Sequence, residues 1–385
     1  MKILHIISSA NPLGGGPIEG IKQLASVNAS HGHRIEVATL DDPDAAYVKS
    51  FPFPIYALGP GYFKYRFSPR LAPWLNAHIA EYDVVIINGL WQYHSFAAWR
   101  ALRHKSTPYV IFTHGMLDPW FKRTYPLKHL KKLLYWPWGE YRVLRDANAA
   151  LFTCEEERML ARQSFRLYHC KEIVVNYGTA GPRGRCVDTF YRQFPDLARK
   201  RLAIFVSRLH VKKGCDLLIR AFAKVLATAN DWHLLICGPD QVGLQAELQA
   251  LASDLGISSR ITWTGMVSGD LKWGALQASE IFVLPSHQEN FGIVVAEALA
   301  CALPVLISNK VNIWREVLED GAGLVADDTF EGTCAMLEKW SDLSLGAREA
   351  VRVNTRPCFE RRFEIQSAAR NLITVLDKVC AAPRA

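Results

Sequence analysis

The chain has 385 residues, of which 50% are hydrophobic and 11% aromatic, and its formal net charge is +8. This composition excludes an intrinsically disordered chain, and the length favours two domains. The positive charge favours anionic partners such as nucleotides and acidic lipid surfaces. No apolar run approaches the ~20 residues of a transmembrane helix, so any membrane contact is expected to be peripheral.

The sequence carries no sign of export or of a metal site. Its nine cysteines are scattered, without a CxxC pair or a histidine cluster at zinc spacing, which is typical of reduced thiols in a cytoplasmic protein. His5 interrupts the short apolar run at the N-terminus and favours a first β-strand over a signal peptide. Asp42-Pro43-Asp44 has the form of a metal-binding Asp-x-Asp, but Asp and Pro are common in turns. We therefore expect no metal and no cofactor.

The first part of the chain alternates short apolar runs with helical patterns. A helix is predicted at Ile18–His31, after the first run. Strands are predicted at Ile3–Ser8, Arg34–Leu40, Asp83–Asn88, Tyr109–Thr113, Ala149–Thr153 and Ile173–Val175. Strands separated by helices predict a parallel sheet with both faces covered.

A second series of elements follows a segment rich in Gly, Pro and Arg, Thr179–Phe194, which predicts a linker. Strands are predicted at Leu202–Ser207, Trp232–Cys237, Ile261–Thr264, Ile281–Leu284 and Pro304–Ser308, and helices at Asp216–Ala227, Gln245–Leu255 and Gly292–Ala300. The fold class is therefore α/β, with two doubly wound domains in series. The last segment, Phe359–Cys380, has the pattern of one long amphipathic helix.

Two polar stretches follow strands of the second series, where doubly wound sheets bind ligands. In Ser207–Gly214, Arg208 can hold phosphate oxygens and Lys213 can add a mobile charge. In Ser286–Ala298, a predicted helix start offers free N–H groups and a positive dipole end to a diphosphate. Each stretch also has a plain interpretation, as a solvated basic turn or as acidic residues at a helix start.

Two further features follow strands of the first series. Gly14-Gly15-Gly16-Pro17 is neither a Walker loop nor a dinucleotide fingerprint, but its glycines allow close approach to a phosphate or sugar. His114 ends the fourth strand, where it can hydrogen-bond or exchange protons. A simple turn and a structural histidine are the alternatives.

These four elements, in this order, resemble the family-4 retaining glycosyltransferases of the GT-B fold, also called glycosyl transferases group 1. The resemblance is densest from Ser207 to Asp327. It rests on Arg208, Lys213-Gly214, Cys237-Gly238-Pro239, Trp263-Thr264-Gly265-Met266-Val267, Glu289-x7-Glu297, Ala302-Leu303-Pro304-Val305 and Asp320-Gly321-Ala322-Gly323-Leu324-Val325.

The resemblance implies two Rossmann-like domains with the donor in a cleft between them. Residues 1–180 would form an acceptor-side domain, completed by a C-terminal helix at about 359–385, and residues 181–358 would bind the nucleotide sugar. It implies catalytic roles for His114, Arg208, Lys213 and Glu289, and donor binding by Gly15, Gly16, Gly265, Met266, Val267, Asn290, Phe291, Gly292, Ile293 and Glu297. Asn88, Trp91 and His94 would lie on the acceptor side.

The chain departs from the family pattern at two places. Asn88 stands before Gly-Leu-Trp where relatives often carry histidine, and Asn176-Tyr177-Gly178-Thr179 replaces the usual Asn-Gly-Val/Ile-Asp. Both places lie on the acceptor side or at the hinge, so they bear on the acceptor rather than on the donor fold.

The segment 119–145 interleaves aromatic and basic residues at helical spacing, and 62–67 is a smaller example. This pattern suits an anionic membrane surface, while a core-facing helix with a solvated basic face is the alternative. No recognised nucleic-acid motif accompanies the charge, so nucleic acid is not an expected partner.

The implied reaction is metal-independent and retaining. It moves a hexose-type sugar from a UDP- or GDP-sugar to a glycan acceptor, such as a lipid-linked polysaccharide, exopolysaccharide or O-antigen intermediate. Fixed cations would stabilise the leaving diphosphate. A nucleotide-sugar 2-epimerase of the same fold and a non-catalytic nucleotide-sugar-binding protein are the alternatives, and a nicotinamide dehydrogenase fits worst because the GxGxxG fingerprint is absent.

Overall fold

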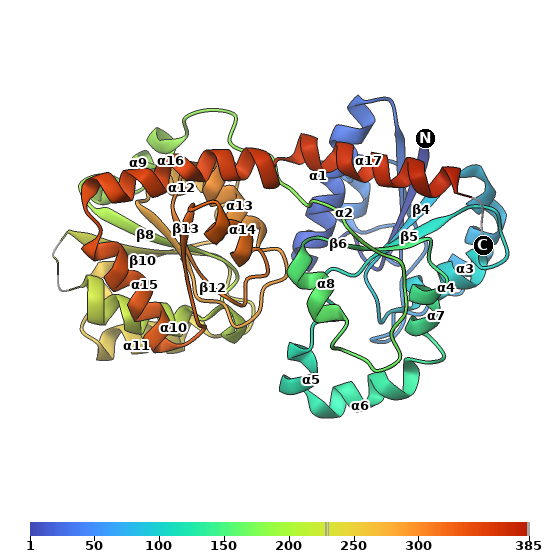
Figure 1. Cartoon of the computed structure of the whole chain (residues 1–385), viewed down its shortest axis with the longest axis horizontal. Coiled ribbons are helices and arrows are strands. Elements are labelled where there is room, and N and C mark those ends of the chain that lie inside the picture. The colour runs from blue at the N-terminus through green and yellow to red at the C-terminus, as the bar shows by residue number, and fades with distance from the viewer. Residues whose placement is uncertain (228, 230, 383–385) are drawn as a thin grey trace. The chain divides into compact units, whose positions relative to one another are not determined.

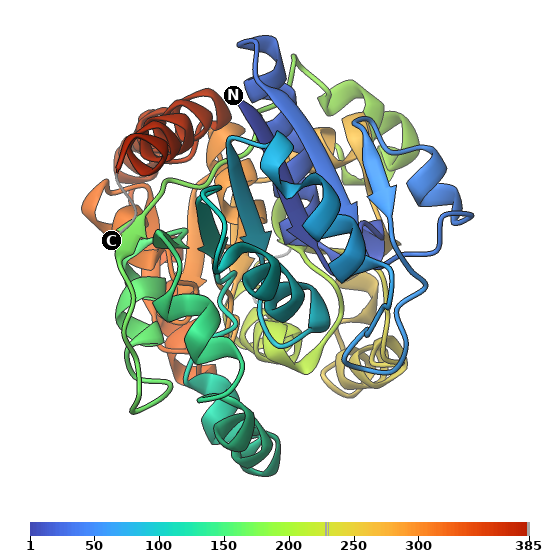
Figure 2. The same ribbon diagram turned by 90° about the vertical axis from the view of Figure 1, so that its right-hand side faces the viewer.

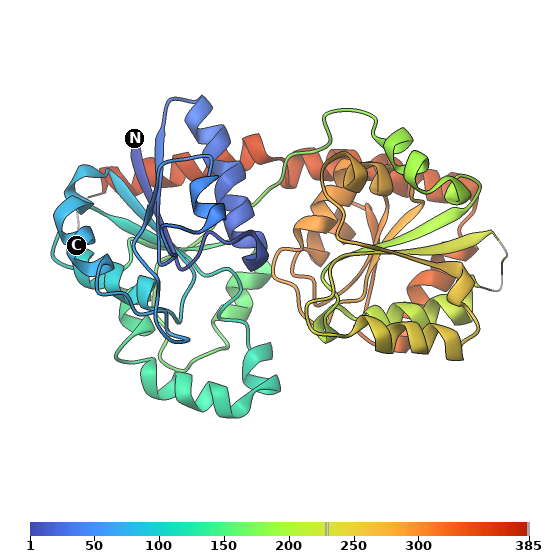
Figure 3. The ribbon, with the colours of Figure 1, turned by 180° about the vertical axis from the view of Figure 1, so that it is seen from behind.

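Two parallel β-sheets organise the chain (Figure 1). The computed structural model describes residues 1–227, 229 and 231–382, so the last three residues of the expected C-terminal segment lie outside the described residues. The chain separates into unit 1, Met1–Gly178 with Ile365–Ala385, and unit 2, Thr179–Glu364. Helices cover both faces of each sheet (Figures 1 and 3). The predicted fold class, α/β with two doubly wound domains, is confirmed.

Unit 1 has a seven-stranded sheet in the order β3-β2-β1-β4-β5-β6-β7, and every pairing is parallel. Its strands are β1 Lys2–Ile7, β2 Arg34–Thr39, β3 Ile55–Ala57, β4 Val84–Asn88, β5 Tyr109–Phe112, β6 Ala149–Phe152 and β7 Glu172–Val174. Its α-helices are α1 Gly16–Ser30, α2 Ala46–Lys49, α3 Leu71–His78, α4 Tyr93–Leu102, α5 Trp120–Thr124, α6 Pro126–Tyr135, α7 Glu140–Arg145, α8 Glu155–Ala161 and α17 Ile365–Ala381. The central strands are buried on both faces, which explains their continuous apolar runs.

Unit 2 has a six-stranded parallel sheet in the order β10-β9-β8-β11-β12-β13. Its strands are β8 Arg201–Val206, β9 Trp232–Cys237, β10 Ile261–Gly265, β11 Ile281–Leu284, β12 Val305–Ser308 and β13 Gly323–Ala326. Its α-helices are α9 Val187–Gln193, α10 Cys215–Ala221, α11 Gln245–Asp254, α12 Gly269–Ala278, α13 Ile293–Ala300, α14 Trp314–Glu319, α15 Phe330–Asp342 and α16 Leu345–Arg362. A π-helical turn, Phe222–Leu226, continues α10, so the helix expected to Ala227 changes its hydrogen-bonding pattern part-way.

The prediction of one helix over Phe359–Cys380 is wrong. Helix α16 ends at Arg362 and α17 begins at Ile365. Phe363 causes the break, because its side chain is 3% exposed and packs edge-on against Phe291 in unit 2, whereas α17 packs on α1 in unit 1. The apolar pattern continues across the break, since both helices bury an apolar face.

The prediction of a linker through Phe194 is wrong over its second half. Residues 187–193 form α9, which packs closely against α12. The contact is tight because a Cβ at Gly274 of α12 would lie 2.4 Å from the carbonyl oxygen of Cys186. Polar composition alone suggested a loop, but the buried side chains of Val187 and Phe190 hold the helix against the unit.

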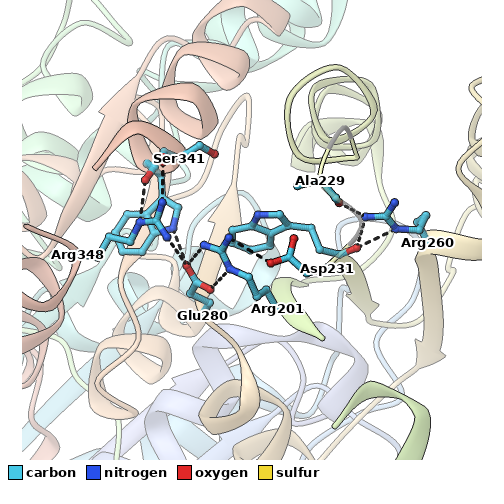
Figure 4. A network of polar contacts seen from close by, with 9 residues as sticks. Arg201, Ala229, Asp231, Arg260, Glu280, Ser341 and Arg348 are labelled. Atoms are coloured by element: carbon cyan, nitrogen blue, oxygen red, sulfur yellow. Dashed lines mark hydrogen bonds and ion pairs between the residues drawn. The ribbon is translucent and has the colours of Figure 1, made fainter. Parts of the chain in front are cut away.

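A polar network fastens the amino-terminal ends of β8 and β11 to the covering helices (Figure 4). The guanidinium of Arg201 donates to both carboxylate oxygens of Glu280, at 2.7 Å each. Trp340 of α15 also donates to this carboxylate at 3.2 Å, and Arg348 of α16 lies 3.6 Å from it. Burial by itself would raise the pKa of Glu280, but the hydrogen bonds and charge of Arg201 dominate and lower it.

No helix within the described ranges combines the length and the apolar character needed to cross a bilayer. The apolar helices of both units instead cover the sheets.

The network around Glu280 yields a stability prediction. Glu280→Gln removes the charge that Arg201 and Arg348 face, and we expect the free energy of unfolding at pH 7 to fall by about 1–3 kcal/mol. The folded-state pKa lies below the unfolded-state value, so this contribution is present above the unfolded-state pKa and is lost as pH falls through the folded-state pKa. Thermal unfolding should show a difference in Tm that shrinks from pH 7 towards pH 3.

Asp231→Asn provides the control, because Asp231 pairs with the same arginine at 3.5 Å but has a side chain that is 51% exposed. Its loss should cost roughly 0–1 kcal/mol. Equal costs for the two variants, or a difference in Tm that stays constant with pH, would contradict the assignment.

Candidate active site

The strand order places a topological switch point between β8 and β11 in unit 2. From β8 the chain runs outward through β9 and β10, and it then returns to β11 on the other side of β8. In open α/β sheets, ligands bind beyond the carboxyl ends of the strands at such a point. The loops at this place are 207–214 and 285–292, which are the two stretches that the sequence analysis singled out.

Backbone contacts join these two loops to each other. His287 N–H donates to the carbonyl of Lys212 at 2.7 Å, and the Ser286 hydroxyl donates to the same oxygen at 2.9 Å. Gly214 has a left-handed backbone with φ 64°, and a Cβ there would lie 2.2 Å from the carbonyl oxygen of Pro285. Glycine is therefore needed where the backbone passes Pro285, rather than only where it would pass a ligand.

Lys213 and Glu289 form an ion pair across the two loops. The ammonium of Lys213 donates to Glu289 Oε2, and the lysine is 8% exposed. Glu289 N–H in turn donates to the carbonyl of Lys310, in the loop after β12, at 2.9 Å. The loops that follow β8, β11 and β12 thus meet at one residue, Glu289, through its side chain and its backbone N–H.

Arg208 also follows β8, and its side chain is exposed. Its Nη1 donates to Gln241 Oε1 at 3.2 Å, in the loop after β9. A single neutral partner at the surface leaves further N–H groups of the guanidinium able to bind an anion. Unit 2 therefore presents one exposed and one buried cation at its switch point.

Helix α13 begins at Ile293, with Gly292 as its N-cap, so its free N–H groups lie directly after the loop that carries Glu289. Asn290 accepts a hydrogen bond from Asn312 at 3.4 Å. The side chain of Phe291 is 6% exposed and packs on Phe363, so only its backbone can contact a ligand. The arrangement suits a diphosphate at the helix N-terminus.

Glu297 is buried on α13 and pairs with Lys272, whose Nζ lies 2.7 Å from Oε1. Lys272 belongs to α12, which follows the turn Gly265-Met266-Val267, and the side chain of Met266 is 70% exposed. Sequence reasoning missed this lysine, because it stands in an ordinary helical pattern with no motif around it. The pair links the expected ribose-binding acid to the expected base-binding turn.

Unit 1 has its own switch point, between β1 and β4. Gly15 and Gly16 follow β1 and begin α1, while Asn88 is the last residue of β4. His114 follows β5, the next strand along the sheet. The residues expected from the first domain therefore gather at the carboxyl edge of this sheet, with His114 beside Asn88.

His114 is held by a chain of hydrogen bonds in the interior of unit 1. Its Nε2 donates to Asn88 Oδ1 at 3.2 Å, and Asn88 Nδ2 donates to His5 Nδ1 at 3.3 Å. Burial lowers the pKa of His114 to about 4, against the charge of Glu157, which acts to raise it. The imidazole is thus neutral at pH 7 and is suited to hydrogen bonding rather than to carrying a positive charge.

Glu157 and Tyr177 hold His114 and the turn that carries it in place. Sequence reasoning did not identify Glu157. The buried carboxylate of Glu157 accepts from the hydroxyl of Thr113 and the N–H of Gly115, both at 2.6 Å, and so fixes the turn on each side of His114. The ring of Tyr177 lies edge-on to His114, with centroids 6.2 Å apart. A Cβ at Gly20 of α1 would lie 1.4 Å from the Tyr177 hydroxyl oxygen, so this tyrosine requires glycine there.

The expected acceptor-side residues differ in exposure. Asn88 and His94 are 3% and 1% exposed, and His94 Nε2 donates to the carbonyl of Asn88 at 2.9 Å. Burial lowers the pKa of His94 to about 4. These two side chains therefore position neighbouring groups, whereas Trp91 is only partly buried and lines a pocket beside α6.

No group of three or more His, Cys, Asp or Glu side chains in the described ranges is arranged to hold a metal ion. Asp42 of the Asp-x-Asp segment accepts the N–H of Asp44 at 2.9 Å and so closes a turn. The turn interpretation of this segment is thus confirmed.

Comparisons with known proteins agree with this geometry. Residues 188–343 match the family model described as Glycosyl transferases group 1, and residues 15–178 match that of the Glycosyl transferase 4-like domain. An uncharacterised glycosyltransferase of Methanocaldococcus jannaschii is 27% identical over 181 residues, which is 46% of this chain and 44% of the relative. The D-inositol 3-phosphate glycosyltransferase of Rhodococcus opacus is 34% identical over 134 residues, which is 34% of this chain and 30% of the relative. The matches thus span less than half the length of these relatives.

Solved structures match over nearly the whole chain. Sucrose-phosphate synthase from Thermosynechococcus elongatus has a TM-score of 0.81 at 18% identity and covers 99% of this chain and 100% of its own. HepE of Anabaena, solved with UDP-glucose, has a TM-score of 0.78 at 17% identity, and the match covers 98% of this chain and 100% of HepE. At such identities the likeness shows the fold alone, and that fold is GT-B.

Proposed function

The chain belongs to the family Glycosyl transferases group 1, and from this premise we propose that it moves a hexose-type sugar, with retention, from a UDP- or GDP-sugar to a glycan acceptor. The observation that carries the proposal is the ion pair of Lys213 with Glu289 at the switch point of unit 2, where Arg208 also follows β8. The HepE structure with UDP-glucose supports a nucleotide-sugar donor, because its fold matches along the full chain.

In this proposal the donor's diphosphate lies against Arg208, Lys213 and the N-terminus of α13. The pair of Lys213 with Glu289 keeps the ammonium in place before the donor binds, so little reorganisation is needed on binding. Glu297, held by Lys272, accepts hydrogen bonds from the ribose hydroxyls. The turn at 265–267 lies beside the base.

The chemistry follows from the charge that develops during transfer. When the bond between the sugar's anomeric carbon and the β-phosphate oxygen breaks, negative charge grows on the diphosphate and the sugar ring gains oxocarbenium character. Arg208, Lys213 and the α13 dipole stabilise that charge. The acceptor hydroxyl attacks from the same face and gives its proton to the leaving phosphate. Neutral His114, whose Nε2–H is already donated to Asn88, accepts a hydrogen bond from a hydroxyl of the transferred sugar through Nδ1.

Arg208→Ala and Lys213→Ala test the donor assignment. Each removes a fixed cation facing the leaving group, so we expect turnover to fall about 10²–10³-fold. Nucleotide release from the donor measures the effect. Arg220→Ala is the matched control, because Arg220 is an exposed arginine on α10 and should leave turnover unchanged. Near-normal turnover in both site variants would refute the assignment.

We also propose that the acceptor is lipid-linked and that unit 1 docks on an anionic membrane surface through 119–145. Helix α6 turns leucines outward, with Leu127 and Leu134 being 79% and 73% exposed, and it projects from the sheet (Figure 2). The segment 62–67 joins this face, because the hydroxyls of Tyr65 and Tyr135 lie 2.7 Å apart. Clustered apolar side chains beside lysines favour an acidic lipid interface.

Leu127→Gln together with Leu134→Gln tests the docking face. Replacing two side chains that enter the lipid should weaken binding to anionic vesicles by about tenfold or more, measured by flotation at low salt. Leu345→Gln is the control, because Leu345 is an equally exposed leucine, at 83%, in unit 2. Docking through α6 is refuted if the unaltered protein does not float with the vesicles, or if the control loses as much binding.

A further inference from the structure

A pocket with an aromatic wall lies in unit 1 between α6 and the body of the unit. Its cavity volume is about 60 Å³, and it opens to the surface of unit 1. Its lining residues are Trp91, Met116, Asp118, Phe121, Lys122, Tyr125, Lys128, His129, Lys132, Ser164 and Phe165. A mainly apolar and aromatic lining with a few charged groups is typical of sites for small organic ligands.

The inner wall of the pocket is a rigid stack of rings. Phe165 stacks on Trp136 with centroids 4.1 Å apart, and Trp91 lies 5.5 Å from Phe165. His129 of α6 stacks on the same Phe165 at 5.0 Å. Such a surface favours an apolar chain, since the rings are held in place before any ligand arrives.

The ammonium of Lys132 lies against the aromatic wall of the pocket. Lys132 Nζ lies 4.2 Å from the centroid of Trp91 and 5.5 Å from that of Phe121. Within the described ranges no carboxylate forms an ion pair with it. Burial lowers the pKa of Lys132 to about 8, although the charge of Glu140 acts to raise it, so the charged form still dominates at pH 7. A positive charge among aromatic side chains, without a carboxylate partner in the described structure, favours a ligand that carries an anionic group.

Two further lysines, Lys122 and Lys128, line the pocket and add charge of the same sign. Lys128 Nζ lies over the ring of Tyr125, 4.5 Å from its centroid. The acidic lining residue, Asp118, accepts the N–H of Trp120 at 2.7 Å and so caps the start of α5. The pocket thus combines an apolar interior with three cations.

We propose that this pocket binds a single-chain prenyl or alkyl phosphate, with the chain on the aromatic wall and the phosphate on Lys132, Lys122 and Lys128. The inference deepens the proposed function and rests on it for the biological role, because such an amphiphile would carry the glycan acceptor. Trp91, expected on the acceptor side from the sequence, forms part of the wall. Binding itself requires no donor.

The test measures binding of farnesyl phosphate to the full-length protein by calorimetry, without nucleotide sugar. Lys132→Gln should weaken binding about 10- to 100-fold, because a charge-assisted contact to phosphate is lost. Lys131→Gln is the matched control, since Lys131 is the exposed neighbour on α6 and does not line the pocket. Lys132→Arg keeps the charge and should restore most of the affinity, which separates loss of charge from loss of folding.

Three further ligands identify the source of the phosphate. Farnesol and inorganic phosphate should each bind at least tenfold more weakly than farnesyl phosphate, because each lacks one half of the ligand. Short-chain phosphatidic acid should also bind more weakly. The proposal is overturned if the protein does not bind farnesyl phosphate, if Lys132→Gln and Lys131→Gln bind it equally, or if phosphatidic acid binds as tightly.

Nucleotide release by the unaltered protein, measured on the same preparation, separates this proposal from the proposed function. Binding of farnesyl phosphate without release from any donor supports the pocket and contradicts the transferase. Release from a donor without binding of farnesyl phosphate contradicts the pocket and supports the transferase.

Discussion

The ion pair between Lys213 and Glu289 is the interaction on which the proposed donor site depends. It joins the loops after β8 and β11, the two strands at the switch point of unit 2. The backbone contacts from Lys212 to Ser286 and His287 hold the same two loops together. Because a buried lysine is costly without a partner, the pair also explains how a cation can remain beside the proposed phosphate site in the absence of the donor.

In unit 1, buried polar side chains also contact one another at the switch point of the sheet, but these side chains are neutral. His5, Asn88 and His114 form a buried chain of hydrogen bonds, and burial holds the pKa of both histidines well below the ordinary value. Glu157 fixes the turn that carries His114. Unit 2 thus offers charge, whereas unit 1 offers a neutral hydrogen-bonding imidazole, and both suit the proposed separation of a charged diphosphate from a sugar.

The sequence predicted most strands to within a residue or two, because strands buried on both faces of a parallel sheet are continuous apolar runs. It failed where packing between distant segments decides the structure. Phe363 ends α16 because it packs on Phe291, and no local signal marks that break. Helix α9 forms within a polar stretch because α12 covers it.

The same distinction holds at the site. Arg208, Lys213 and Glu289 were identifiable because they follow strands and belong to a motif. Lys272 and Glu157 were not, since they act through partners far away in the sequence, Glu297 and the turn at Thr113–Gly115. The burial of Asn88 and His94 likewise depends on how β4 and α4 pack, which a family motif does not reveal.

The central claim is that the switch point of unit 2 holds a nucleotide-sugar donor. Incubation of the protein with a panel of UDP-, GDP- and ADP-sugars, without acceptor, tests it most directly through release of the nucleotide. We expect slow hydrolysis of one UDP- or GDP-sugar, because the charged site activates the leaving group even when water is the acceptor. Absence of release from every donor, together with absence of binding by calorimetry, would contradict the claim and leave only the fold.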